Sequence, residues 1–297
     1  MTRAEAGPPS LEVADDGVAT ITLRRPQHRN RLHREDLHRL RAHFAALHDD
    51  PHARVLVLTG EGEAFSAGFH IGELDAADNA TADPYLFEET VDALEALPLP
   101  TVARLNGSVY GGGTDLALAC DFRIGVETMS LRMAAAGLGL HYYPSGMQRY
   151  VERLGLGAAK RLFLLAEVVP AAELLRFGYL DEAVPADLLD ARVRCIVDTL
   201  AGNAPLAVRL MKLSLNDVAR GRMDLASIRQ REGICANSAV RLMIVRAPTC
   251  HFAISIPQIT GCCRVTGPLI GIVTKISEGQ AGARAFYRAP PRLAPQR

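Results

Sequence analysis

Two glycine-bearing turns, each placed after a short apolar stretch, constrain this chain more than any other feature of its sequence. The first spans residues 65–70 and reads Phe-Ser-Ala-Gly-Phe-His; the second spans residues 106–115 and contains three consecutive glycines. Each turn is followed by a run of helical character. Two such turns can direct two backbone N–H groups at one oxygen atom, which is the arrangement of an oxyanion hole. The sequence therefore predicts acyl or enolate chemistry rather than a simple binding module.

Length and charge limit the class of protein. A chain of 297 residues with 48% apolar residues is one large domain or two small ones with a substantial core. Lysine plus arginine and aspartate plus glutamate both number 33, so no global field favours nucleic acid or an anionic membrane as a partner. We see neither a signal-peptide pattern nor an apolar stretch long enough to span a bilayer, and we expect a cytoplasmic protein.

The cysteine and histidine patterns do not favour a metal site. The six cysteines form no Cys-x-x-Cys pair, which argues against zinc or a thioredoxin-like centre and for reduced thiols. Histidines recur at every fifth position over residues 28–48. Steps of five advance about 140° around a helix, so these rings would spiral instead of converging. We therefore expect no metal.

The order of apolar stretches predicts an α/β core followed by helices. Strands are expected at residues 18–23, 55–59, 101–105 and 120–126, and a helix with one apolar face is expected to end near Asp49. From residue 144 to about 216 the pattern is helical, with breaks at Gly155, Gly178, Pro185 and Pro205. The expected organisation is a flexible tail at 1–10, the α/β core at 11–200, a helical region at 201–239 and an atypical tail at 240–297.

The order and spacing of several motifs resemble the crotonase (enoyl-CoA hydratase/isomerase) superfamily. The resemblance runs from about residue 11 to about 239 and includes residues 23–26 with Asn30 and Leu32, the two glycine turns, and residues 119–124 and 144–149. It implies a crotonase-like spiral of ββα units with a helical C-terminal region. It also implies an acyl-CoA substrate, whose coenzyme A is the only cofactor-like group, and a homotrimer or a pair of trimers.

The tail departs from the resembled pattern. Residues 240–276 are β-branched and contain Pro248, Pro257 and Pro268, which cannot continue a helix through their middle. We expect the helix to stop near Ala239. Residues 240–276 are then an insertion before a displaced final helix at 278–286, or the whole tail is unrelated sequence.

The resemblance also implies roles for single residues. The backbone N–H groups of Phe69 and Gly112 would form the oxyanion hole, and Asp115 would be the leading acid/base candidate, where the family commonly carries glutamate. A capping role in the first turn of a helix is the alternative for Asp115. Arg29 or a neighbouring arginine would lie beside the nucleotide end of coenzyme A. The remaining positions implied in substrate binding are Asn30, Ala67, Gly68, His70, Gly111, Ala135, His141 and Tyr142.

The second catalytic carboxylate of the family's hydratases is missing. Its position is occupied by Ala135, and a methyl group cannot transfer a proton. His141, Tyr142 and Tyr143 could supply a polar replacement, or they form an aromatic packing patch. Besides hydration, the sequence therefore leaves open isomerisation, decarboxylation or thioester hydrolysis with one carboxylate, and non-catalytic acyl-CoA binding.

Overall fold

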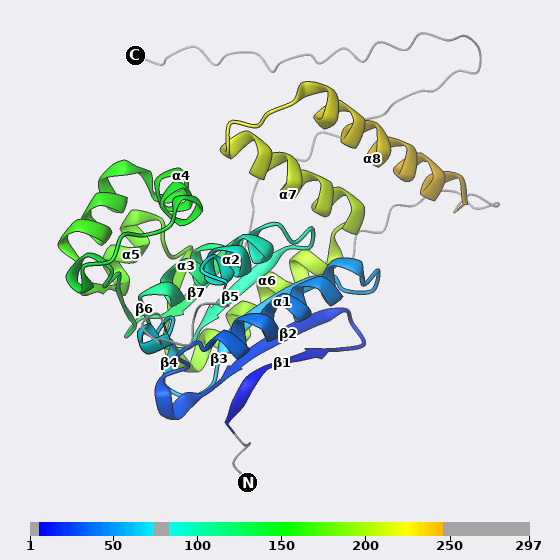
Figure 1. Cartoon of the computed structure of the whole chain (residues 1–297). Helices are drawn as coiled ribbons and strands as arrows, with labels where there is room; N and C mark the ends of the chain where they lie inside the picture. The colour runs from blue at the N-terminus through cyan, green and yellow to red at the C-terminus, as the bar shows by residue number, and fades with distance from the viewer. Residues whose placement is uncertain (1–5, 74–82, 246–297) are drawn as a thin grey trace, which may run out of the picture. The chain divides into compact units, whose positions relative to one another are not determined.

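A six-stranded sheet forms the centre of the protein. The computed structural model describes residues 6–73 and 83–245 (Figure 1). The strand order is β1-β2-β3-β5-β7-β10; β1 is antiparallel to β2, and every other neighbouring pair is parallel. The strands are β1 (Gly7–Val13), β2 (Val18–Arg24), β3 (Val55–Gly60), β5 (Thr101–Leu105), β7 (Phe122–Val126) and β10 (Glu182–Val184).

A second, smaller sheet carries the two glycine turns. Its strand order is β4-β6-β8-β9, with β4 parallel to β6, β6 parallel to β8, and β8 antiparallel to β9. The strands are β4 (Ala64–Ser66), β6 (Ser108–Tyr110), β8 (Ser130–Arg132) and β9 (Val169–Pro170). Because β4 and β6 are parallel neighbours, the turns that follow them leave the sheet at the same edge.

Helices follow or separate the strands. They are α1 (Arg34–Asp49), α2 (Leu86–Glu95), α3 (Gly112–Leu118), α4 (Pro144–Lys160), α5 (Ala171–Phe177), α6 (Leu189–Gly202), α7 (Pro205–Ala219) and α8 (Leu225–Val245). The apolar stripe of α1, which consists of Leu37, Leu40, Phe44 and Leu47, is 0–2% exposed. Strand β3 is buried at every position, as expected for a central parallel strand. The predicted α/β fold with a helical C-terminal region is confirmed.

The predicted helix breaks also have structural counterparts. Gly155 has a φ of 78° inside α4, where it kinks the helix, and Gly178 ends α5 in the left-handed region. Pro205 is the first residue of α7, where a missing N–H costs no helical hydrogen bond.

Two expectations at the ends of the chain were wrong. Residues 7–10 are not a flexible tail but the first part of β1. Pro8 and Pro9 are tolerated there because β1 is an edge strand, and its register with β2 shifts between Gly7 and Ser10. The last described helix does not stop near Ala239 but continues to Val245, since no proline lies between Pro205 and Pro248. The expectations for residues 246–297 lie outside the described residues. Within the described ranges, no helix combines the length and the apolarity needed to cross a bilayer.

Candidate active site

The two glycine turns touch each other. Gly68 has a φ of 82°, and a Cβ atom added to it would lie 2.6 Å from the carbonyl oxygen of Tyr110 and 2.7 Å from the nitrogen of Gly112. Only glycine can occupy position 68, because it adopts this positive φ without strain and has no side chain to collide with the second turn. The first turn is therefore fixed against the backbone of the second.

Some backbone groups in and around these turns are hydrogen-bonded, whereas the N–H groups of two residues make no backbone hydrogen bond among the described residues. Leu32 N–H donates to the Gly68 carbonyl at 2.8 Å, and His70 N–H donates to the Leu32 carbonyl at 2.9 Å, so the backbone on either side of Phe69 is held in place. Gly112 is the first residue of α3, and its N–H has no partner within the helix. In the described part of the chain, neither the Phe69 N–H nor the Gly112 N–H donates a backbone hydrogen bond.

Both residues line one cavity of about 640 Å³. This cavity also collects most of the positions that the sequence predicted as parts of the site, namely Ala67, Gly111, Ala135, His141 and Tyr142. Ala135 is half-buried and forms part of the cavity wall, as expected for a small apolar residue. The predicted gathering of two distant turns and the segment around residue 135 is therefore found in the structure.

An aromatic row runs along the cavity from Phe69. The ring of Phe87 in α2 lies 5.8 Å from that of Phe69, and the ring of Tyr143 lies 5.9 Å beyond Phe87. A Cβ atom on Gly112 would meet the Phe87 ring at 2.5 Å, so Phe87 covers Gly112 directly. The Tyr142 ring stacks on Tyr143 at 4.3 Å. Tyr143 also lines the cavity, so this aromatic row joins the first glycine turn to the start of α4.

The expectation that Asp115 borders this cavity was wrong. Asp115 is 0% exposed and does not line the cavity. Both of its carboxylate oxygens lie 2.8 Å from Nη1 of Arg149, and Oδ2 accepts a short hydrogen bond from the Tyr143 hydroxyl. Tyr143, which lines the cavity, thus connects Asp115 to it. Asp115 lies in the first turn of α3, which packs into the core and buries this side chain.

Burial has the largest effect on the pKa values of Asp115 and Tyr143. Burial raises the pKa of the Asp115 carboxyl above its usual value, against the opposing effects of Arg149 and the Tyr143 hydroxyl. Burial and the nearby Asp115 charge raise the pKa of Tyr143 well above its ordinary value. Tyr143 is therefore a neutral phenol at physiological pH, able to donate its proton to Asp115 in a hydrogen bond.

Arg149 is the cation at the centre of a larger buried network. Its Nη2 lies 2.6 Å from Asp92, and its Nε lies 3.0 Å from Glu95, which also pairs with Arg153 and Arg220. Burial would raise the pKa of Glu95, but the three arginines outweigh burial and hold the pKa below its usual value. This network fixes α2, α4 and α7 around Asp115.

Four predicted substrate-binding residues do not line this cavity: Arg29, Asn30, Gly68 and His70. Gly68 is buried against the backbone of the second turn. Asn30 is 1% exposed, and its amide is fully engaged: Oδ1 accepts from Arg25 N–H at 2.9 Å, and Nδ2 donates to the carbonyls of Glu61 and Ala64 at 2.8 Å each. Asn30 therefore holds the turn and is not placed to touch a ligand. His70 instead packs edge-on against His33, with ring centroids 5.0 Å apart. The expectation that Asn30 and His70 line the substrate cavity was therefore wrong.

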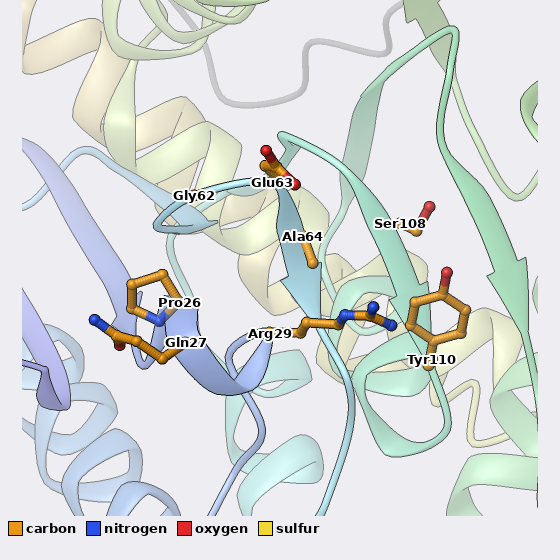
Figure 2. Close-up of a pocket in the computed structure, with 8 residues that line it drawn as sticks. All are labelled: Pro26, Gln27, Arg29, Gly62, Glu63, Ala64, Ser108 and Tyr110. Atoms are coloured by element: carbon orange, nitrogen blue, oxygen red, sulfur yellow. The ribbon is translucent and has the colours of Figure 1, made fainter.

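Arg29 lines a second cavity of about 480 Å³, shown in Figure 2. Its side chain extends toward Tyr110, which lines both cavities (Figure 2). Arg29 has a φ of 51°, an uncommon value for a residue with a side chain. Its guanidinium group makes no ion pair with any residue that the structure describes. Of the predicted arginines, Arg29 is thus the one that faces a cavity beside the glycine turns.

Sequence reasoning missed the acidic residues of the larger cavity. Glu88 in α2 and Asp83 before it both line the cavity. Glu88 is half-buried, whereas Asp83 is exposed. The available signal was a pair of glutamates in the first turn of α2, a pattern that by itself indicates only a solvated helix start.

The fold and this site together define an α/β protein with a crotonase-like arrangement of two glycine turns at one cavity. A model of the enoyl-CoA hydratase/isomerase family matches residues 14–238. The chain therefore belongs to this family, and the expectation of an acyl-CoA-transforming enzyme of this type is confirmed at the level of the family.

Individual relatives agree with this assignment. A crotonyl-CoA hydratase of Syntrophomonas wolfei is 31% identical over 215 residues, covering 71% of this chain and 83% of the relative. A putative enoyl-CoA hydratase/isomerase of Bacillus subtilis is 35% identical, covering 69% of this chain and 80% of the relative. The crystal structure of an enoyl-CoA hydratase from Bacillus anthracis superposes with a TM-score of 0.69 at 30% identity, covering 79% of this chain and 92% of that one.

Proposed function

We propose that the protein binds the carbonyl oxygen of an acyl-CoA thioester at the N–H groups of Phe69 and Gly112 and stabilises an enolate there. The observation that carries this proposal is the contact of the two turns, with Gly68 against Gly112 and both N–H groups unclaimed by described residues. Removal of one such donor typically costs about 10²–10³ in kcat. The cavity of about 640 Å³ is within the size range of small-molecule sites and would hold the acyl chain.

The proton carrier that we propose is Tyr143, supported by Asp115. A proton leaving the carbon next to the thioester carbonyl would pass to the Tyr143 oxygen while the Tyr143 proton passes to Asp115. The electron pair of the broken C–H bond moves onto the carbonyl oxygen, where the two N–H groups stabilise it. This role rests on the hydrogen bond from the Tyr143 hydroxyl to Asp115 and on the position of Tyr143 in the cavity wall. Asp115 is then a positioning residue.

The phosphates of coenzyme A are proposed to lie toward Arg29. Tyr110 lines both cavities, so a long thioester could extend from the acyl cavity past Tyr110 to the arginine. Arg29 would supply local positive charge in a protein of zero formal net charge. No further cofactor is part of this proposal.

We further propose a homotrimer or a pair of trimers in the cytoplasm. Met211, Leu215 and Val218 follow one face of α7 and are 57, 68 and 49% exposed, which supports an interface there. The cysteines of the described residues, Cys120, Cys195 and Cys235, are free, as in a reducing compartment. Sedimentation measures the assembly, and a monomer at micromolar concentration would contradict it.

A panel of short-chain thioesters tests the activity. We expect turnover of a 2-enoyl-CoA, followed by the loss of absorbance of the conjugated double bond. Conversion of a 3-enoyl-CoA alone would identify an isomerase; release of carbon dioxide from a malonyl-type thioester, a decarboxylase; and release of free thiol, a hydrolase. Tight binding without turnover of any of these substrates would contradict an enzymatic role and leave the acyl-CoA-binding alternative.

A further inference from the structure

We propose that Glu88 is the second carboxylate of this site and activates the water that is added to the double bond of a 2-enoyl-CoA. The inference rests on the proposed function and deepens it. Hydration benefits from two proton carriers, one for water and one for the carbon next to the thioester. Ala135 supplies none, and the side chain of Glu88 reaches the same cavity from a different helix.

The two oxygens of Glu88 have different surroundings. Oε1 accepts a hydrogen bond from the Ser145 hydroxyl at 2.9 Å and lies 3.3 Å from the Ser145 backbone nitrogen. Oε2 has no hydrogen-bond or ion-pair partner among the residues that the structure describes. One oxygen is thus fixed and the other is left for a ligand, which is what a positioned proton acceptor requires.

The neighbours of Glu88 belong to the proposed site. Phe87, the preceding residue, covers Gly112 and contacts the rings of Phe69 and Tyr143. Ser145, which holds Glu88, is two residues beyond Tyr143 at the start of α4. The hydrogen bonds between α2 and α4 therefore bring Glu88 and Tyr143 to one cavity with the two unclaimed N–H groups.

Other titratable groups in the cavity fit this role less well. Those that line it besides Glu88 are Arg34, Asp83, Tyr85, Tyr110, His141, Tyr142 and Tyr143. Asp83 is the other carboxylate, but it is exposed, and its Oδ1 accepts from the Tyr85 N–H at 2.9 Å. His141 is exposed, and its Nδ1 contacts the Tyr142 carbonyl at 2.8 Å. Glu88 is the half-buried carboxylate of the cavity.

The chemical step balances with these residues alone. Glu88 takes a proton from water as the water oxygen bonds to the β-carbon, and the π electrons of the double bond move onto the thioester oxygen. Tyr143 then gives its proton to the α-carbon, and the proton taken up by Glu88 returns to the Tyr143 oxygen through water in the cavity. One water molecule has been added to the substrate. Asp115 stays ionised beside Arg149 throughout, and Glu88 and Tyr143 end in the states in which they began.

The matched pair Glu88→Gln and Glu89→Gln tests the inference. Glutamine keeps an oxygen that can accept from Ser145 but cannot take a proton from water. Glu89 is the next residue on α2; it is exposed and pairs with Arg41 at 2.6 Å. For Glu88→Gln we expect kcat for hydration to fall about 10²–10⁴-fold, as for loss of a general base. For Glu89→Gln we expect hydration within about twofold of the wild type, as for other exposed surface changes.

A second readout separates a catalytic from a merely structural role. Exchange of the α-protons of a saturated acyl-CoA in D₂O, followed by NMR, needs the oxyanion hole and Tyr143 but no water activation. Glu88→Gln should therefore keep exchange while it loses hydration. Hydration equal to that of Glu89→Gln would overturn the inference, and so would a parallel loss of hydration, exchange and thermal stability. A wild-type protein with neither hydration nor exchange would instead overturn the proposed function, and this inference with it.

Discussion

Replacement of Tyr143 by phenylalanine removes the hydroxyl group that donates to Asp115 from a residue of the cavity wall. The phenyl ring keeps its packing against Phe87 and Tyr142, at 5.9 and 4.3 Å between ring centroids. Asp115 keeps both contacts of 2.8 Å to Arg149. The cavity therefore retains its shape, and the change isolates the phenol hydroxyl as a proton carrier.

The size of the effect follows from what the hydroxyl does. As a proton carrier it contributes about 10²–10⁴ in rate, which corresponds to about 3–5 kcal/mol of barrier. As a hydrogen bond to a charged group it contributes about 1.5–3 kcal/mol to folding. Because ground-state binding does not use the hydroxyl, KM for the acyl-CoA should change little.

The assay is α-proton exchange in D₂O together with kcat and KM for hydration. Tyr179→Phe is the control, because the Tyr179 hydroxyl is also buried, donates to the Thr114 carbonyl at 2.7 Å and lies outside the cavity. We expect Tyr143→Phe to lose exchange at least a hundredfold and Tyr179→Phe to lose stability only. Exchange by Tyr143→Phe within about threefold of the wild type would refute the relay through Asp115.

Three further changes test other parts of the site. Arg29→Gln should raise KM for an acyl-CoA about ten- to hundredfold with kcat retained, and should leave KM for a pantetheine thioester, which lacks the nucleotide phosphates, unchanged. Glu95→Gln should destabilise the fold by about 3–5 kcal/mol at pH 7. Since the folded pKa of Glu95 is depressed, its stabilisation is present above about pH 4.3 and lost as pH falls through the folded pKa, so the variant should show a shallower acid limb in denaturant titrations. Ala135→Glu added to Glu88→Gln should regain at least about tenfold in hydration, because it returns a carboxylate to the cavity wall; no gain would contradict a water site between these positions.

Hydrophobic periodicity was sufficient to predict the larger elements of the fold. The 3.6-residue pattern of α1 and the continuous apolar run of β3 each determine their own structure. The four strands of the smaller sheet are two or three residues long and carry no usable period. They form because the glycine turns pack together, which is a tertiary effect. The end of α8 was missed for a different reason, since β-branched residues lower helix propensity only slightly.

The site was predictable where its chemistry resides in the backbone. Phe69 and Gly112 were predicted from the resemblance of the two glycine turns to the family pattern, and both residues line the larger cavity. The roles of side chains were harder to predict from the sequence, because they depend on how deeply a residue is buried and on how the helices pack. Asp115 is buried by the packing of α3, and Glu88 lines the cavity with one oxygen held by Ser145 at the start of α4. Neither fact has a local sequence pattern.

Asp115 and Tyr143 are joined by a hydrogen bond and are best considered together. An aspartate is one methylene shorter than the glutamate common at this position in the family, and here its carboxylate lies against Arg149 beneath the cavity. A Cβ atom on Gly146 would lie 2.7 Å from Oδ2 of Asp115, so α4 is packed as closely on the carboxylate as a glycine allows. The same turn of α4 follows Tyr143, whose hydroxyl donates to Asp115 from the cavity wall. In the proposed mechanism, Tyr143 therefore supplies the reach that the shorter side chain lacks, while the negative charge of Asp115 remains paired with Arg149 and shielded from water.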